Sequence, residues 1–448
     1  MRTVKQLAVR GAIWTIIGFG GTYLLRFGNN LILTRLLQPE FFGLMAFVNT
    51  LRMGLELFSD IGIGQNIINS KRGDEQSFLN TAWTLQIIRG FIIWFICLLI
   101  SFPLAYFYND QRLQWLIPIV VINSILSGFL STSIHTLQRR MELGKLSLYE
   151  VILQFAYFST LIFLVWLYPS IWTLAIGTLI PSVYKLISSY WLIPNYSNWF
   201  KWDKDAVKEI LAFGKWMFLA SGFMFAAEQA DYMILGKLLS FKMLGVYIIA
   251  YTLASIPREI MKVLSNKVIF PAIAKQSDLP RHILREKILP QRRILLLGFA
   301  ILLAVLVNTG DLAVSILYDK RYSDAGWMMP ILCCGMWFSL LFYTISPALL
   351  ALGKPLYSAQ SNFARFAIIV IAVPLLYQKF GVVGAVIAIA FSDLPLYLTN
   401  LYGLWREKLF CLTQDMKATF FFVTVVISFL IIRNNLGFGF SIQQLLMN

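Results

Sequence analysis

Long apolar runs recur along the whole chain and are separated by short polar segments. Many runs extend for about 20 residues, the length that a helix needs to cross the hydrocarbon layer of a membrane. The pattern predicts thirteen membrane-spanning helices over these ranges: 11–35, 41–64, 82–107, 114–137, 147–168, 171–193, 211–238, 243–270, 293–318, 326–351, 361–380, 381–403 and 417–435. We therefore expect an all-α polytopic membrane protein.

Composition and charge agree with a membrane location. Of the 448 residues, 58% are hydrophobic and only 13% are charged, which is unusual for a water-soluble protein. The net charge of +16 would ordinarily suggest a nucleic-acid partner. However, the cations gather in alternate loops, such as Lys71/Arg72, Arg139/Arg140 and the cluster from Lys275 to Arg293. This bias predicts a cytoplasmic N-terminus and removes the need for nucleic acid.

No motif for an enzyme or a bound cofactor stands out. The four cysteines lack the spacing of a disulfide framework or metal site. The two histidines, His135 and His282, are far apart, and no G-x-x-x-x-G-K-[ST] phosphate-binding loop is present. We expect no enzymatic activity and no cofactor, so energy would come from a Na⁺ or H⁺ gradient, the membrane potential or consumption of the product.

An internal repeat relates the two halves of the chain. A shift of 202 residues aligns ILTRLLQPEFFGLMAF (32–47) with ILGKLLSFKMLGVYII (234–249), and Gly43 falls on Gly245. The shift places span 1 on span 7 without reversing its direction. It predicts two parallel-duplicated six-helix bundles around a central cavity, over residues 1–200 and 201–410, followed by one extra C-terminal span and tail over 411–448.

Ionisable and amide side chains lie inside the predicted spans, where a charge costs at least about 2.5–3.5 kcal/mol. They recur at helical spacing, so each set shares one helix face. We expect these faces to line a watery cavity. The candidate substrate-binding residues are Arg26, Asn29, Asn30, Arg52, Arg258 and Lys262. The candidate ion-coupling or gating residues are Glu56, Asp60, Glu228 and Asp231. Further lining candidates are Arg89, Lys185, Arg365 and Asp393.

The alternative is that these charges brace the helices without a ligand. In that case Arg26 would pair with Glu56, and Glu228 with Arg258. Both interpretations hold together if a pair formed in one conformation opens in another to receive an anionic group.

Three segments carry a resemblance to a known family: LTRLLQPEFFGLMAF (33–47), DIGIGQNIIN (60–69) and QRRMELGKL (138–146). They resemble the oligosaccharide flippases of the polysaccharide transporter group, which are relatives of the lipid II flippase and of the multidrug and toxin extruders. The likeness extends over essentially the whole chain through its span order. In the lipid II flippase, arginines in spans 1, 2 and 8 line the cavity, so the resemblance implies that role for Arg26, Arg52 and Arg258.

The resemblance implies a multi-pass protein of a bacterial inner membrane that moves polyprenyl-diphosphate-linked oligosaccharide from the cytoplasmic to the outer leaflet by alternating access. Expected partners are that lipid-linked oligosaccharide, membrane lipids and the polysaccharide polymerase or export machinery. A multidrug cation antiporter of the same fold is the main alternative, although inward cations disfavour it. A membrane polysaccharide polymerase or ligase is less favoured because the predicted outward loops are short. The basic segment 276–293 is expected to be a cytoplasmic connector, with an anionic-lipid contact as the alternative.

Overall fold

The computed structural model describes residues 20–22, 25–59, 62–70, 72–140, 143–193, 197–276 and 278–437. Regular structure in these ranges is entirely helical, which confirms the all-α expectation. The chain divides into two compact units, Met1–Phe225 and Ala226–Asn448. The predicted domain limits at 200/201 and 410/411 and the central cavity stay predictions.

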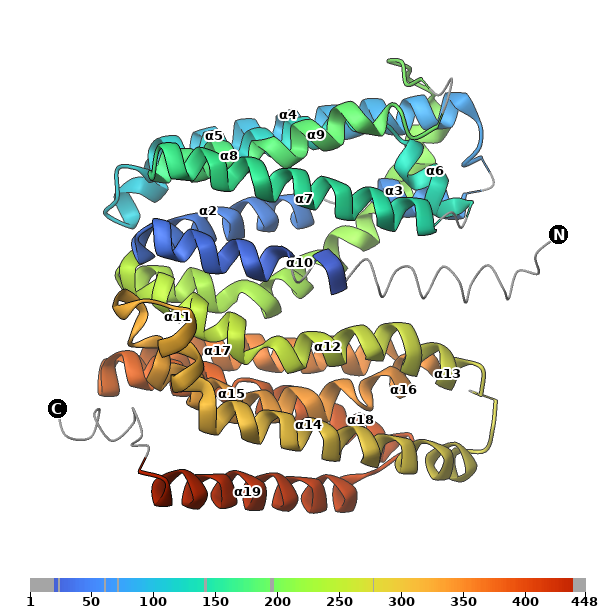
Figure 1. Cartoon of the computed structure of the whole chain (residues 1–448). Helices are drawn as coiled ribbons and strands as arrows, with labels where there is room; N and C mark the ends of the chain where they lie inside the picture. The colour runs from blue at the N-terminus through green and yellow to red at the C-terminus, as the bar shows by residue number, and fades with distance from the viewer. Residues whose placement is uncertain are drawn as a thin grey trace. The chain divides into compact units, whose positions relative to one another are not determined.

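The first unit contains nine labelled helices in addition to helical residues 25–36 (Figure 1). They are α2 (Pro39–Phe58), α3 (Ile63–Asn69), α4 (Gln76–Phe107), α5 (Leu113–Gly128), α6 (Ser133–Arg139), α7 (Leu143–Leu167), α8 (Ile171–Gly177), α9 (Leu179–Ser189) and the first part of α10 (Lys204–Leu238). Helices α4 and α5 pack closely at Gly90, where an added Cβ would lie 2.5 Å from the carbonyl oxygen of Ser124. The predicted span 114–137 is bent by 59° between α5 and α6.

The second unit contains the end of α10 and the remaining helices. They are α11 (Phe241–Ala254), α12 (Ile256–Leu264), the π-helix η1 (Ser265–Ile269), α13 (Phe270–Ala274), α14 (Arg281–Leu317), the short 3₁₀ helix η2 (Lys320–Tyr322), α15 (Ala325–Tyr343), α16 (Ser346–Ala351), α17 (Pro355–Ala390), α18 (Asp393–Arg406) and α19 (Leu412–Asn435). Helix α17 is broken at Gly381, whose φ is 58° and ψ is −143°. Glycine tolerates this positive φ, and the break coincides with the predicted boundary between spans 361–380 and 381–403.

Helix order repeats between the units, and the first interhelical turn falls at matching positions. The helix that includes residues 25–36 ends at residue 36 and α10 ends at Leu238, while α2 begins at Pro39 and α11 at Phe241. Both separations equal the 202-residue shift. The separation grows to 205 residues between the starts of α4 and α14, and to 212 between those of α5 and α15. The duplicated order is therefore present, and residues added around α14 change its register.

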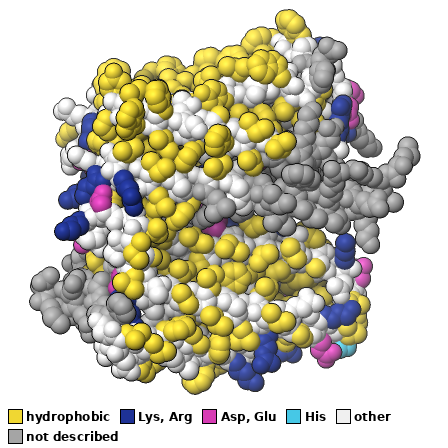
Figure 2. Space-filling view, viewed as in Figure 1, with side chains coloured by type: hydrophobic (Ala, Val, Ile, Leu, Met, Phe, Trp, Pro, Cys, Tyr) yellow, Lys and Arg dark blue, Asp and Glu magenta, His cyan; other side chains and the backbone are white. Residues whose placement is uncertain are grey.

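Many helices present apolar side chains outward, as lipid-facing helices do. Seven helices in the described ranges are long and apolar enough to cross a membrane, and the bent pair α5 and α6 makes an eighth. On α4, Phe91, Phe95, Leu99 and Phe102 are each about half exposed. Figure 2 shows such side chains across the visible face of the helices, with many of the charged groups near helix ends. The count of thirteen spans stays a prediction, because other expected spans carry charges or are broken into shorter helices.

The start of α10 is fixed within the first unit. Arg72 donates to Asp203 Oδ2 at 2.7 Å, and Ser70 donates to Glu209 at 2.6 Å. The Arg72 guanidinium and backbone N–H groups hold the pKa of Asp203 below its usual range. Close to Asp203 in sequence, Ala206 belongs to a buried apolar cluster with residues of α3 and α4.

Helix α19, the extra C-terminal helix, is fixed along α14 at both ends by buried ion pairs. Arg292 pairs with Asp415, and Arg433 Nη2 pairs with Asp311 at 2.6 Å. The two α14 positions are 19 residues apart, or about 28 Å along a helix. This distance is close to the roughly 30 Å thickness of the hydrocarbon layer. The ion pairs therefore bracket a helix of transmembrane length, as predicted for residues 417–435.

Gly335 offers a test of close helix packing. A Cβ at this position of α15 would lie 1.9 Å from the carbonyl oxygen of Ala390, so Gly335→Ala is expected to lower the free energy of unfolding by about 1–3 kcal/mol through overpacking. Gly298→Ala is the matched control, because its Cβ meets no atom within 4 Å. Thermal unfolding of the purified variants in detergent measures the difference. Equal melting temperatures for both variants would contradict the packing at Gly335.

Candidate functional site

A polar cluster lies between α2, α4 and α5 in the first unit. Arg52 Nη1 pairs with Glu56 Oε1 at 2.8 Å, one helical turn along α2, and Ser124 Oγ of α5 donates to the same oxygen at 2.7 Å. Arg89 of α4 donates to the backbone oxygen of Glu56 and, at 3.1 Å, to Ser59 Oγ. The side chains of Arg52 and Glu56 are 26% and 27% exposed. We call Arg52, Glu56, Arg89 and Ser124 the Glu56 cluster.

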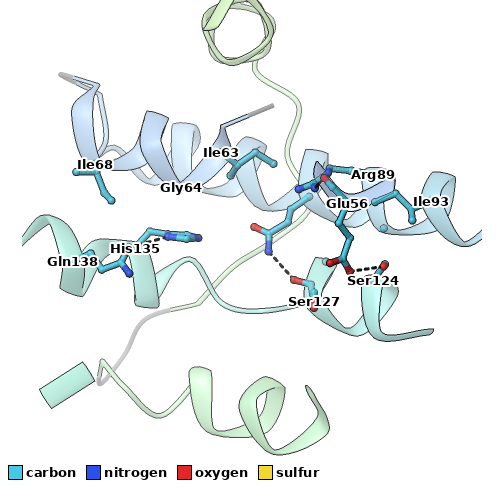
Figure 3. Close-up of a pocket in the computed structure, with 13 residues that line it drawn as sticks. Glu56, Ile63, Gly64, Ile68, Arg89, Ile93, Ser124, Ser127, His135 and Gln138 are labelled. Carbon is cyan, nitrogen blue, oxygen red and sulfur yellow. Dashed lines mark hydrogen bonds between the residues drawn. The ribbon is translucent and has the colours of Figure 1, made fainter. Parts of the chain in front are cut away.

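A pocket of about 370 Å³ adjoins the Glu56 cluster. In Figure 3, Glu56, Arg89 and Ser124 lie toward one end, and His135 and Gln138 of α6 toward the other. Gln86 also lines the pocket and donates to the backbone oxygen of Ser127 at 2.7 Å. The pocket therefore offers hydrogen-bond donors and acceptors inside a largely apolar bundle.

Arg26 contacts α7 rather than the residues of the Glu56 cluster. Its Nε lies 3.4 Å from Gln154 Oε1 of α7. Arg26, Gln154, Glu150 and Lys185 line a second pocket, of about 410 Å³. The pair between Arg26 and Glu56 considered from the sequence is wrong, because Arg26 contacts Gln154 while Glu56 pairs with Arg52.

The asparagines on the Arg26 helix are enclosed. Asn29 is 8% exposed, and the Oδ1 atoms of Asn29 and Asn30 are buried without a hydrogen-bond partner among the described residues. Such groups are polar positions at which a ligand or water would restore a hydrogen bond. Asp60, expected on the same face as Arg52 and Glu56, lies outside the described residues.

A corresponding charged face is present in the second unit. Lys262 Nζ of α12 donates to Glu228 Oε1 of α10 at 2.7 Å. Arg258 Nη1 donates to Tyr251 OH at 2.8 Å, and its Nη2 lies 3.2 Å from Glu259 Oε1. The predicted pair of Glu228 with Arg258 is therefore wrong, since Lys262 takes that position. The side chain of Arg258 is 12% exposed, so it is more enclosed than Arg52.

Two buried carboxylates lie deeper in the second unit. Asp231 of α10 is 1% exposed, and Tyr247 OH donates to its Oδ2 at 3.0 Å. The other oxygen, Oδ1, lacks a hydrogen-bond partner among the described residues. Asp393 of α18 pairs with Arg365 Nε at 2.9 Å and accepts a hydrogen bond from Ser339. Asp393 is thus compensated by a cation, whereas one Asp231 oxygen is left for another partner.

The structure groups the candidates into local sets. Arg89 joins Arg52 and Glu56, Lys185 joins Arg26, and Arg365 joins Asp393. Sequence reasoning missed the uncharged members of these sets, because a single hydroxyl or amide in an apolar span is a weaker signal than a charge. These members are Ser124, Gln154, Tyr247, Tyr251 and Ser339.

Comparison with known proteins gives the family. Residues 32–326 match the model of a family described as polysaccharide biosynthesis protein. The chain belongs to this family. Among relatives of this polysaccharide biosynthesis protein, the teichuronic acid biosynthesis protein TuaB of Bacillus subtilis (strain 168) is 24% identical over 306 residues, which cover 67% of this chain and 62% of TuaB. This chain thus spans less than two thirds of the length of TuaB. The lipopolysaccharide biosynthesis protein WzxC of Escherichia coli (strain K12) is 21% identical over 390 residues, 85% of this chain and 77% of WzxC.

Solved structures confirm the predicted duplicated helical fold. The lipid II flippase MurJ in an inward closed conformation matches with a TM-score of 0.74 at 14% identity, covering 94% of this chain and 92% of that one. An inward-facing multidrug resistance transporter of the MATE family matches with a TM-score of 0.62 at 13% identity, covering 91% and 96%. At these identities the likeness concerns the fold alone. With its apolar helices, this polysaccharide biosynthesis protein is a multi-pass membrane protein.

Proposed function

We propose that this polysaccharide biosynthesis protein is a flippase rather than an enzyme. It moves polyprenyl-diphosphate-linked oligosaccharide repeat units from the cytoplasmic to the outer leaflet of a bacterial inner membrane by alternating access. The observation that carries the proposal is the partly exposed cationic face in the spans of each half, Arg52 in one and Arg258 with Lys262 in the other. Family membership and the fold shared with a lipid II flippase support it.

The cations suit a diphosphate. A guanidinium group binds phosphate oxygens through two parallel N–H donors, which a lysine ammonium group cannot do. Arg52 and Arg258 would bind the diphosphate, and Arg26 and Lys262 would add positive charge along its path. Asn29 and Asn30 would offer their amide oxygens to sugar hydroxyl groups.

The ion pairs provide a means of releasing the diphosphate. Glu56 competes with an anionic ligand for Arg52, and Glu228 competes for Lys262. A conformation that separates these pairs frees the cations, and one that forms them displaces the ligand. Glu56 and Glu228 would then act as gates rather than as ligand-binding groups.

A deletion strain tests the proposed function. Loss of the gene is expected to stop surface polysaccharide production and to leave lipid-linked repeat units on the cytoplasmic leaflet, because the polar head cannot cross unaided. Repeat units that reach the outer leaflet but stay unpolymerised would instead indicate a polymerase or ligase. Normal polysaccharide together with greater sensitivity to cationic drugs would indicate a multidrug antiporter.

We also propose that a Na⁺ or H⁺ gradient drives transport, with Glu56, Asp60, Glu228 and Asp231 as the coupling candidates. Asp231 supports this assignment, because it is buried and no described residue forms a hydrogen bond with its Oδ1 atom. In reconstituted vesicles, flipping is expected to slow several-fold when the gradient is collapsed with an ionophore, and Asp231→Asn is expected to remove the difference. Equal rates with and without the gradient would exclude coupling.

The orientation and partners are also part of the proposal. We place the N-terminus in the cytoplasm because the loops on that side carry most of the cations. The polysaccharide polymerase or export machinery would receive the flipped repeat units. Labelling of single cysteines in whole cells is expected to reach the Asn109 turn and not the turn at Arg140.

A further inference from the structure

A pocket between α14 and α19 lies outside the sites described above. It has a volume of about 420 Å³. Arg293, Leu296 and Leu297 line it from α14, and Gln414, Lys417 and Phe421 line it from α19. These residues are three or four positions apart on each helix, so each set forms one continuous face. The pocket is a groove with cations at one end and apolar side chains along it.

The two cations of the pocket are available to an anion. Arg293 and Lys417 are exposed, and no acidic side chain is among the residues that line the pocket. The neighbouring Asp415 is buried and already paired with Arg292. The pocket therefore has a local excess of positive charge.

The cations lie at the depth of lipid headgroups. Arg293 immediately precedes the apolar run that begins at Ile294 in α14, and Lys417 immediately precedes the run that begins at Ala418 in α19. Both positions are close in sequence to the Arg292–Asp415 pair. This pair marks one end of the part of α14 between Arg292 and Asp311, which is about 28 Å long. Leu296, Leu297 and Phe421 continue from the cations toward the hydrocarbon layer.

We propose that this groove binds an anionic phospholipid. The phosphate group lies between Arg293 and Lys417, and an acyl chain lies along Leu297 and Phe421. Basic pockets between membrane-spanning helices suit such headgroups. A free phosphate would not contact the apolar side chains of the groove. The bound lipid would contact both α14 and α19 and so help to hold the extra C-terminal helix against α14.

Lipid binding to the purified full-length protein tests the proposal without any transport assay. Native mass spectrometry is expected to show retention of phosphatidylglycerol in preference to phosphatidylcholine. The double variant Arg293→Gln/Lys417→Gln is expected to weaken phosphatidylglycerol binding by at least about tenfold, since each cation near the surface contributes about 1 kcal/mol. Both side chains are exposed, so the fold is expected to persist.

Two controls separate this site from general attraction to a basic protein. Arg285→Gln/Lys287→Gln removes the same charge from exposed positions of α14 outside the pocket and is expected to retain binding. Phe421→Ala is expected to weaken binding without a change of charge, and inorganic phosphate is expected not to compete. Equal retention of both lipids, an equal loss in the Arg285/Lys287 control, or full competition by phosphate would each overturn the proposal.

Discussion

Replacement of Arg258 by glutamine is expected to reduce export of repeat units by at least about thirtyfold. Glutamine can still donate a hydrogen bond to Tyr251, but it lacks the charge and the planar fork that bind a diphosphate. Removal of one partner from an enclosed charged contact costs at least about 2 kcal/mol, which gives the thirtyfold estimate. The Arg258 side chain is 12% exposed and its Nη1 is held by Tyr251, so it is already positioned.

Two further variants show which property of Arg258 matters. Arg258→Lys keeps the charge and loses the fork, so it is expected to have an intermediate rate. Arg321→Gln is the matched control, because Arg321 pairs with Asp319 at an exposed 3₁₀ turn. The rate of polysaccharide production at equal protein levels measures all three variants. Normal production in Arg258→Gln would contradict the role of this arginine.

The second large effect is expected from the buried pair that holds α19. Arg292→Met is expected to lower the free energy of unfolding by about 3–5 kcal/mol, because it leaves Asp415 as an uncompensated buried charge. Arg292 also donates to Thr344 Oγ1 at 3.0 Å and to Gln414 Oε1 at 3.1 Å, so several acceptors lose their donor together. Thermal and denaturant unfolding in detergent measures the loss.

The exposure of the pair decides the size of this effect. The side chains of Arg292 and Asp415 are 1% and 2% exposed, whereas those of Arg321 and Asp319 are 37% and 36% exposed. Arg321→Gln is therefore expected to cost at most about 1 kcal/mol. The double variant Arg292→Met/Asp415→Leu is expected to recover much of the loss, because no unpaired charge stays buried. Equal stability of Arg292→Met and Arg321→Gln would show that the buried pair does not hold α19.

Apolar periodicity predicted the main features of the fold because each membrane helix must satisfy its own backbone hydrogen bonds. The boundary expected near residue 381 is a backbone break at Gly381, and the 202-residue shift reproduces the end of α10 and the start of α11. The interruptions inside spans were not predicted. The span expected over 114–137 bends between α5 and α6. The bend contains Ser131, Thr132 and Ser133 and no proline, and hydroxyl residues do not by themselves end a predicted helix.

Partners of the candidate residues were harder to predict than the residues themselves. Arg258 and Lys262 lie one turn apart on α12, so either could face α10 by periodicity. Helix rotation and side-chain length decide that Lys262 reaches Glu228. Similarly, Arg52 pairs with Glu56 of the same helix, one turn away. Such a pair forms without any contact between distant segments of the chain. Spacing within a helix could be predicted, but contacts between helices required the packed structure.

Transport by the purified protein in vesicles tests the central claim most directly. A polyprenyl-diphosphate-linked oligosaccharide with a fluorescent sugar is placed in one leaflet, and its arrival in the other is followed by quenching with a reagent that cannot cross the membrane. We predict rapid transfer with the wild-type protein and little above the protein-free rate with an Arg52→Gln/Arg258→Gln variant. Transfer at the protein-free rate with the folded wild-type protein, or equal transfer with the variant, would contradict a flippase that uses cationic side chains within its spans.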